Sequence, residues 1–401
     1  MKYWRGYLTA AILGFFSWML ITFAKGHAEL IDMVYPYVTR MLQGFLAEWS
    51  IGVDFCVWQL VALLLIVAII ATLVLAVVFR WNLIQWFGWV TAVGSLLFFL
   101  HTGIYGLNSY AGSIADDIRL QKSEYSLNEL KEATIYYRDH ANALATKVPR
   151  DAQAEPVYPT FEELAAQAED GFHTLVYDRS YSIFAGSTLP VKQLGWADMY
   201  TSMGITGFTM SLTGEAAVNP QIPVVSLPFT MCHEMAHRMS IALESDANMA
   251  AFLACAANSS PEYQYSAYFM AYRYCYNAMA TLGGPEATEA TKTVSAGVND
   301  YFYRDLQAYD SFFAQKKDEQ ATQVATTVND SYIKANGDDR GTASYGDVCD
   351  FLVNWHIQTV VLPTQVVEET KFDPFDETQV DLSGLVHAAK VATDGNEENT
   401  D

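Results

Sequence analysis

The chain is poor in cysteine and in basic side chains. Its 401 residues include five cysteines, with no CxxC pair, and 23 lysines and arginines against 45 acidic residues, a net charge of -22. A disulfide framework and a cysteine-bound structural zinc both need paired cysteines, so neither is expected. A surface this acidic repels phosphate groups, which excludes nucleic acid as a partner.

Charged residues are also missing from three long stretches near the N-terminus. Residues 6–24, 55–79 and 81–115 contain no Asp, Glu, Lys or Arg. About 20 apolar residues in a helix cross the hydrocarbon core of a bilayer, so each stretch is long enough to span it. We expect three transmembrane helices, at about residues 6–24, 55–79 and 83–105, with the lipid bilayer as a partner.

The charges that flank these stretches predict their orientation. Lys2 and Arg5 precede the first stretch, and Arg80 lies in the short turn between the second and the third. The positive-inside rule places both sites in the cytoplasm, and three spans then put the chain after about residue 110 on the extracytoplasmic side. A first stretch that is instead a cleaved signal peptide leaves this placement unchanged.

Composition divides the chain into three parts. Residues 1–110 have a net charge of +1 and are expected to form a membrane domain, while the rest of the chain carries -23. Residues 111–363 combine helical patterns with a short β-prone segment. Residues 364–401 are acidic and weakly apolar, which is typical of a disordered tail. The fold class expected is α+β, mainly α with a small β-sheet.

Capping residues and turn residues predict individual elements. Ser126 with Glu129, and Thr160 with Glu163, are the paired residues of a capping box, so each pair opens a helix. The segment GFTMSLTGEAAV at residues 207–218 is the strongest candidate for a strand or hairpin. Further helical patterns lie at residues 246–280, 287–325 and 347–361.

The segment His233-Glu234-Met235-Ala236-His237 carries the main chemical signal. Two histidines four positions apart share one face of a helix, about one turn apart, so both imidazoles can bind the same zinc ion. Glu234 would lie near the open coordination position, where a polarised water needs a general base. The pattern predicts one Zn²⁺ per chain and hydrolysis of a peptide bond, with Glu234 passing a proton from water to the leaving nitrogen.

A third ligand is needed, because two histidines alone rarely hold a catalytic zinc. Glu244 is the first candidate, with Asp246 or a distant residue as the alternative. On an unbroken helix Glu244 would lie about 10 Å along the axis from His237, too far for one metal. The chain must therefore turn between residues 238 and 243, although no Gly or Pro marks a turn there and Ser240 is the weakest helix former.

These residues also resemble a known pattern. The run HEMAHRMSIALESDANMAAFLAC is similar to the HExxH…ExxAN pattern of gluzincin-type peptidases, in which two histidines and a glutamate bind zinc. More of the chain, to about residue 360, resembles an uncharacterised bacterial family of membrane proteins with three N-terminal spans. The matching pieces are Gly106-Leu-Asn108, Thr213-Gly-Glu215, Pro228-Phe-Thr230, Tyr265-Ser266, Val328-Asn-Asp330, Tyr332-Ile-Lys-Ala335 and Ser344-Tyr-Gly346.

The resemblance implies a zincin-like metallopeptidase domain over residues 111–363, a peptide or protein substrate, and a bacterial cell membrane as the location. Zn²⁺ would be bound by His233, His237 and Glu244. The chain departs from that family at Ser240, where such sequences often carry Gly, and at Asp246, where they often carry Glu.

Other parts of such a site have weaker candidates. An electrophile should stabilise the oxyanion, and Tyr265, Tyr268 and Tyr272 share one helical pattern, although a tyrosine stripe is more often part of a core. In zincins an edge strand pairs with the substrate backbone, and residues 207–218 are the natural candidate. Glu215, at the end of that segment, is interpreted as a turn residue.

Two other classes of function are compatible with the sequence. A non-catalytic, zincin-like membrane sensor or partner-binding protein would use the acidic outward domain without hydrolysis. A transporter or channel is disfavoured, because the three spans hold hardly any charge for ions to follow.

Overall fold

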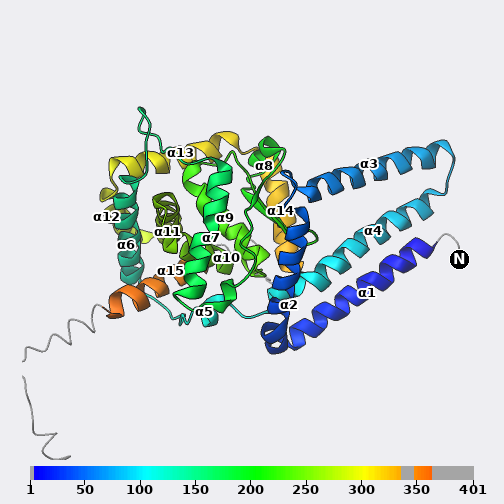
Figure 1. Cartoon of the computed structure of the whole chain (residues 1–401), viewed down its shortest axis with the longest axis horizontal. Coiled ribbons are helices and arrows are strands. Elements are labelled where there is room, and N and C mark those ends of the chain that lie inside the picture. The colour runs from blue at the N-terminus through cyan, green and yellow to red at the C-terminus, as the bar shows by residue number, and fades with distance from the viewer. Residues whose placement is uncertain (1–3, 336–346, 364–401) are drawn as a thin grey trace, which may run out of the picture. The chain divides into compact units, whose positions relative to one another are not determined.

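The computed structural model describes residues 4–335 and 347–363 and is mainly helical with one small sheet, as the composition predicts (Figure 1). Residues up to Trp355 form one compact unit, and the described residues from His356 onward belong to a second. In the second unit, the described residues continue as a π-helical turn, Ile357–Val361. The tail expected from residue 364 lies outside the described residues.

Among the described residues, three helices are long and apolar enough to cross a membrane, in agreement with the prediction. They are α1 (Arg5–Gly26), α3 (Val57–Val78) and α4 (Leu83–Ile104). Most of their apolar side chains are exposed, which suits a helix surrounded by lipid. The first and last spans approach closely, since a Cβ added to Gly6 would lie 2.4 Å from the carbonyl carbon of Gly88.

A further helix, α2 (Ala28–Ser50), joins the first span to the second. The sequence patterns above do not predict it, because Pro36 and four charged residues interrupt its apolar pattern. Pro36 lies inside the helix and is buried. The described structure therefore has four long helices, α1 to α4, and not three, near the N-terminus. We call the described residues 111–335 and 347–355, which follow them, the large domain.

The sheet has three short strands in the order β1-β3-β2, with bounds Lys192–Gln193 for β1, Gly207–Met210 for β2 and Glu215–Val218 for β3. The hairpin predicted at residues 207–218 is confirmed: β2 pairs antiparallel with β3, while β1 pairs parallel with β3. All four β3 residues are buried, and β2 lies at one edge of the sheet.

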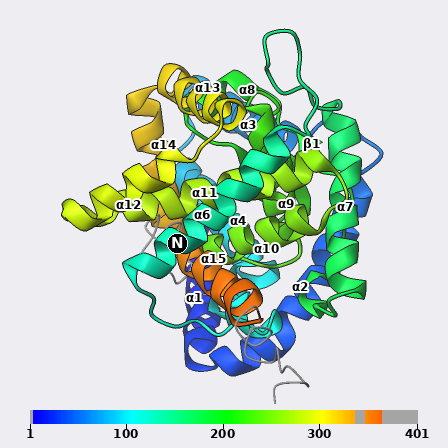
Figure 2. The same ribbon diagram turned by 90° about the vertical axis from the view of Figure 1, so that its left-hand side faces the viewer.

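Two helices lie at the centre of the large domain, α9 (Leu227–Arg238) and α10 (Glu244–Ala257), as Figure 2 shows. Eleven of the 14 residues of α10 are buried. It packs against α7 (Phe161–Tyr177), α9 and α11 (Pro261–Leu282), and α11 packs against α6 (Leu127–Ala145). These neighbours hold the ends of α9 and α10 in fixed positions.

The predicted capping boxes are present at the first residues of two of these helices. Ser126 caps α6 and Thr160 caps α7. The five cysteines are free and buried. The remaining elements are η2 (Gly106–Tyr110), α5 (Ile114–Asp117), η3 (Ser182–Phe184), α8 (Ala197–Ser202), η4 (Val224–Ser226), α12 (Gly284–Ala296), α13 (Asp300–Lys316), α14 (Glu319–Ala335) and α15 (Val348–His356).

Candidate metal centre

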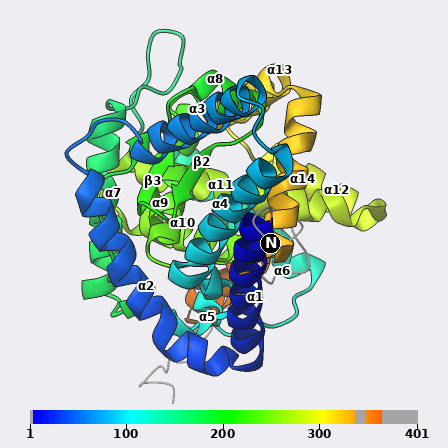
Figure 3. The same cartoon turned by 90° about the vertical axis from the view of Figure 1, so that its right-hand side faces the viewer.

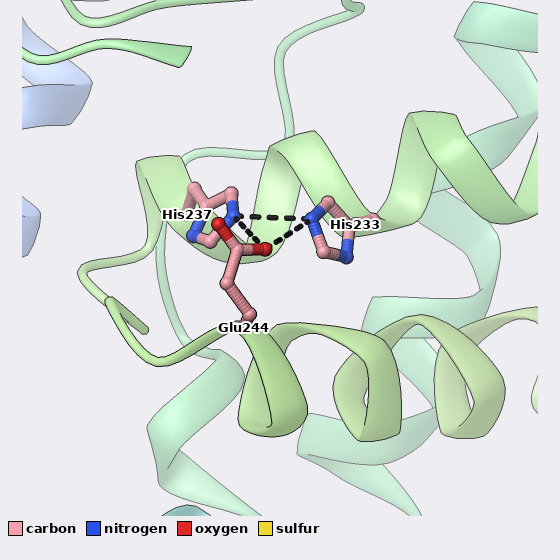
Figure 4. Close-up of side chains that lie close together, drawn as sticks. All are labelled: His233, His237 and Glu244. Atoms are coloured by element: carbon pink, nitrogen blue, oxygen red, sulfur yellow. Dashed lines mark hydrogen bonds and ion pairs between the residues drawn. The ribbon is translucent and has the colours of Figure 1, made fainter. Parts of the chain in front are cut away.

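The turn that the third ligand requires is present. The motif helix α9 ends at Arg238, and α10 begins at Glu244 on the returning chain. Figure 4 shows the two histidines on α9 facing the glutamate, which comes from the first turn of α10. The chain reversal thus brings together three side chains that an unbroken helix would keep apart.

Backbone hydrogen bonds explain how α9 ends without Gly or Pro. The Ile241 N–H donates to the carbonyl oxygen of Ala236, and the Ser240 N–H donates to that of His237, the two bonds of a Schellman helix end. This ending needs a left-handed residue, and Ser240 adopts a φ of 70°. Serine therefore takes the conformation that Gly usually supplies.

The distances within the cluster suit a tetrahedral metal. The Nε2 atoms of His233 and His237 are 3.1 Å apart, and they lie 3.3 and 3.5 Å from Oε2 of Glu244. A tetrahedral zinc with ligands at about 2.0 Å has ligand–ligand separations of about 3.3 Å. All three side chains are largely buried, with 13–17% of each exposed. The donor set and its spacing therefore fit Zn²⁺.

The same helix end orients one ligand. Nδ1 of His237 lies 2.8 Å from the carbonyl oxygen of Ile241, so Nδ1 carries the hydrogen and Nε2 presents its lone pair to the cluster. Nδ1 of His233 is buried without a hydrogen-bond partner among the described residues. The Schellman turn thus both reverses the chain and fixes the tautomer of His237.

Electrostatics favour a cation among these groups. Burial opposes the ionisation of both His237 and Glu244. For His237, the charge of Glu244 outweighs the effect of burial and raises the pKa to about 9. In return, His237 and His233 hold the pKa of Glu244 well below its usual range. A metal ion binding here would displace the proton that His237 otherwise keeps.

The candidate general base lies against the edge strand. Glu234 is 4% exposed, and burial raises its pKa. The Thr209 hydroxyl donates to Oε2 of Glu234 at 2.7 Å and also lies 2.9 Å from the Glu234 carbonyl oxygen. A Cβ on Gly207 would lie 2.4 Å from Oε1 of Glu234, so only glycine allows β2 to pass this close. Sequence reasoning missed Thr209, whose only signal is its place on the strand.

Asp246, the alternative ligand, lies outside the cluster. Its carboxylate accepts hydrogen bonds from the Ser113 hydroxyl at 3.1 Å and the Ile114 N–H at 3.2 Å, at the start of α5. Burial raises its pKa to about 6. The structure therefore gives Asp246 a role in holding α5 against α10.

The three tyrosines suggested as oxyanion stabilisers are also placed elsewhere. The Tyr265 hydroxyl donates to Asp305 at 2.5 Å, Tyr268 stacks on His140, and Tyr272 stacks on Tyr276. These contacts belong to the packing around α11, so the helical stripe is part of the core.

A different tyrosine of the same helix contacts residues one helical turn away from the ligands. The Tyr274 hydroxyl donates to Oδ1 of Asn248 at 3.1 Å, and its ring contacts Phe229, one turn before His233. Burial raises the pKa of Tyr274, and the charge of Glu244 adds to the rise. Tyr274 lies on the opposite side of α11 from the predicted stripe, which is why the periodicity did not select it.

Glu215 is not a turn residue. Its carboxylate pairs with Lys192 at 2.8 Å and accepts hydrogen bonds from the N–H groups of Val57 and Trp58 at 2.8 and 2.9 Å. It therefore caps the first turn of α3 and ties the second span to the sheet.

Comparison with known proteins adds a family but no activity. The profile of one family, described as "Protein of unknown function (DUF3810)", matches residues 31–353. The match includes most of α2, two of the three spans and the whole cluster. No curated protein matches the chain. No solved structure matches it.

Proposed function

The chain belongs to the DUF3810 family of proteins of unknown function, and we propose that it is a membrane-anchored, zinc-dependent metallopeptidase. One observation carries the proposal: His233, His237 and Glu244 place three ligand atoms within 4.8 Å of one another. Glu234 follows His233 on the same helix, and its buried carboxylate lies within range of the charges of both histidines. This is the donor set and base of a zinc hydrolase.

The chain's own residues suit the chemistry. Zn²⁺ bound there would supply Lewis acidity, polarising a carbonyl group and lowering the pKa of a water molecule. Glu234, held by Thr209, would take a proton from the attacking water and deliver it to the leaving nitrogen. Tyr274 is our candidate donor to the developing oxyanion, since its side chain contacts Asn248 and Phe229, which each lie one helical turn from a ligand.

The edge strand β2 supports a peptide as the substrate. In an antiparallel pair, alternate residues direct their peptide groups to the partner strand. The Asn219 N–H donates to the Thr206 carbonyl, so Gly207 and Thr209 direct their peptide groups to the free edge. An extended peptide pairing there would pass beside Glu234.

The proposal places the protein in a bacterial cell membrane with the large domain outside the cytoplasm. Arg5 is the first residue of α1, and Arg80 lies in the turn between α3 and α4. Figure 1 shows that the start of α1 and this turn both point away from the large domain. The positive-inside rule assigns those ends to the cytoplasm.

The test is Glu234→Gln in the full-length protein, with the exposed Glu289→Gln as the matched control. We expect Glu234→Gln to retain one zinc per chain and to lose roughly 10²–10⁴-fold in peptide hydrolysis. Zinc content and cleavage of a peptide library are the readouts. Equal cleavage by the wild type and Glu234→Gln would contradict the proposal. A cellular phenotype that Glu234→Gln fully preserves would favour a non-catalytic sensor or partner-binding protein.

A further inference from the structure

The helix α2 has its polar face turned inward. Thr39, Arg40 and Gln43 are each at most 5% exposed. The Thr39 hydroxyl donates to the Ser240 hydroxyl at 2.9 Å, Nε of Arg40 donates to the Met239 carbonyl at 3.2 Å, and the Gln43 amide donates to the Ser211 carbonyl at 3.0 Å. The polar side of this helix therefore packs against the large domain through these hydrogen bonds.

The opposite face of α2 is apolar and exposed. At a helical repeat of 3.6 residues, its large apolar side chains fall on one side, away from the buried face. We name this set the α2 stripe: Leu30, Met33, Val34, Tyr37, Val38, Met41, Phe45 and Trp49. Exposure reaches 78% at Met41 and 79% at Trp49. Among the charged residues of α2, only Glu48, near the end of the helix, falls within the α2 stripe.

Exposed apolar surface of this extent needs a partner, and the neighbouring elements identify it. A single residue separates α1 from α2, and six separate α2 from α3, so α2 lies between two candidate spans. Figures 1 and 3 show α2 running across the ends of α1 and α4 next to the large domain. Its 23 residues extend about 35 Å, which suits a helix lying along a membrane surface.

We propose that α2 lies in the plane of the membrane interface, with the α2 stripe in the acyl-chain boundary and the polar face on the large domain. The α2 stripe is thus covered by lipid of the bilayer that α1, α3 and α4 cross. Because α2 holds Met239 and Ser240, it also fixes the chain reversal of the metal cluster at that surface.

The experiment places a polarity-sensitive label at Met41→Cys in the full-length protein, reconstituted in nanodiscs. The native cysteines are buried, so the introduced thiol is the accessible one. Glu289→Cys, on the exposed surface of α12, is the matched control. We expect lipids that carry a quencher on the acyl chain to quench the Met41 label several-fold more than the control label.

Two outcomes would overturn this assignment. A Met41 label as open to a water-soluble quencher as the Glu289 label would show that the stripe faces water. A label shielded from both quenchers, together with cross-linking between Met41→Cys chains, would show that a second copy covers the stripe.

A separate set of contacts bears on the substrate, and the inference drawn from it rests on the proposed function. Ser211, in the turn after β2, lies 2.8 Å from Nδ1 of His101 in α4. Thr209, two residues earlier, bonds to Glu234. Two residues of strand extend about 7 Å, so the candidate base lies close to the end of the third span.

We infer that the substrate is a polypeptide anchored in the same bilayer and cut within a few residues of the membrane surface. The edge of β2 runs from Glu234 toward α4, so a strand added there would continue toward the end of a neighbouring transmembrane segment. A soluble peptide has no membrane anchor that would hold it beside β2.

The test uses one peptide sequence, either free or joined to a transmembrane anchor through spacers of increasing length, in proteoliposomes that hold the zinc-loaded protein. We expect the anchored form with a short spacer to be cut at least tenfold faster than the free peptide, and the gain to vanish with long spacers and with Glu234→Gln. Equal cleavage of free and anchored peptides would overturn the substrate inference alone. Cleavage of neither form would instead count against the proposed peptidase.

Discussion

At the scale of single residues, two carboxylates of one helix have different surroundings. Glu244, at the start of α10, meets both histidines, whereas Asp246 is rotated about 200° around the helix and faces α5. A residue's position in the helical repeat, and not its chemical type, decides which acid can serve as a ligand. This difference leads to a direct test.

We expect Glu244→Ala to lower the zinc content of the purified full-length protein from about one per chain to near zero at micromolar free zinc, since only two ligands remain. Asp246→Asn should keep the metal, because its carboxylate contacts Ser113 and Ile114 instead. Metal analysis after dialysis is the measurement. Loss of zinc from Asp246→Asn with retention in Glu244→Ala would reverse the assignment.

Asp246 also predicts a dependence of stability on pH. Burial raises its pKa from 3.8 to about 6, so ionisation above that range penalises the folded state more than the unfolded one. This contribution to stability is complete below about pH 4 and is lost as the pH rises through 6. Asp246→Asn cannot ionise, so its stability relative to the wild type should rise by up to about 3 kcal/mol between pH 4 and 8. Thermal unfolding in detergent at several pH values checks this, and a difference independent of pH would contradict it.

Tyr274 gives a third prediction at this scale. If its hydroxyl donates to the oxyanion, Tyr274→Phe should lower kcat/KM by roughly 10²-fold with zinc retained. Tyr268→Phe and Tyr272→Phe are matched controls on the same helix, and both should stay near the wild type because their rings lie in the core packing. A larger effect in either control than in Tyr274→Phe would remove Tyr274 from the site.

At the scale of elements, the end of α9 is the critical feature. Its Schellman bonds and the left-handed Ser240 reverse the chain, and the turn's own carbonyl at Ile241 orients His237. One short turn therefore positions two ligands, the histidine before it and the glutamate after it. Thr39 of α2 supports the turn from outside.

Ser240→Val should disrupt this turn. A β-branched residue is strained at a φ of 70°, and valine also loses the hydrogen bond from Thr39, so we expect a loss of about 2–4 kcal/mol and weaker zinc binding. Ser240→Gly relieves the strain while losing the same hydrogen bond, and it should stay within about 1 kcal/mol of the wild type. Unfolding and zinc titration measure both. A Val variant as stable as the Gly variant would show that the turn tolerates other conformations.

At the scale of the whole molecule, the N-terminal helices and the large domain share buried contacts. Glu215 caps α3, and the hairpin residue Ser211 is held by both Gln43 and His101. The sheet therefore lies between the spans and the motif helix, and its stability depends on both.

We expect the isolated fragment 111–363 to be less stable than the full chain, because it loses at least three buried hydrogen bonds worth about 1 kcal/mol each. The melting temperature should fall by roughly 10 °C, and zinc binding should weaken. A fragment that begins at residue 28 keeps α2 and is the control. Equal stability of the two fragments would show that α2 does not support the domain.

The sequence alone determined those features whose cause is local. Spans follow from uninterrupted apolar composition, helix starts from capping boxes, and the two histidines from a spacing that a single helix places on one face. Spacing also required a reversal before Glu244, although the serine at its centre gave no conventional turn signal.

Only the tertiary structure decided which distant groups meet. The contact of Thr209 with Glu234, the side of α11 that carries Tyr274, and the cap that Glu215 gives to α3 all depend on packing between elements. For α2, the sequence shows apolar and polar residues alike, and which face is covered depends on the neighbouring domain. Local sequence patterns determine which chemical roles are open to a residue, whereas long-range packing determines which residues it contacts.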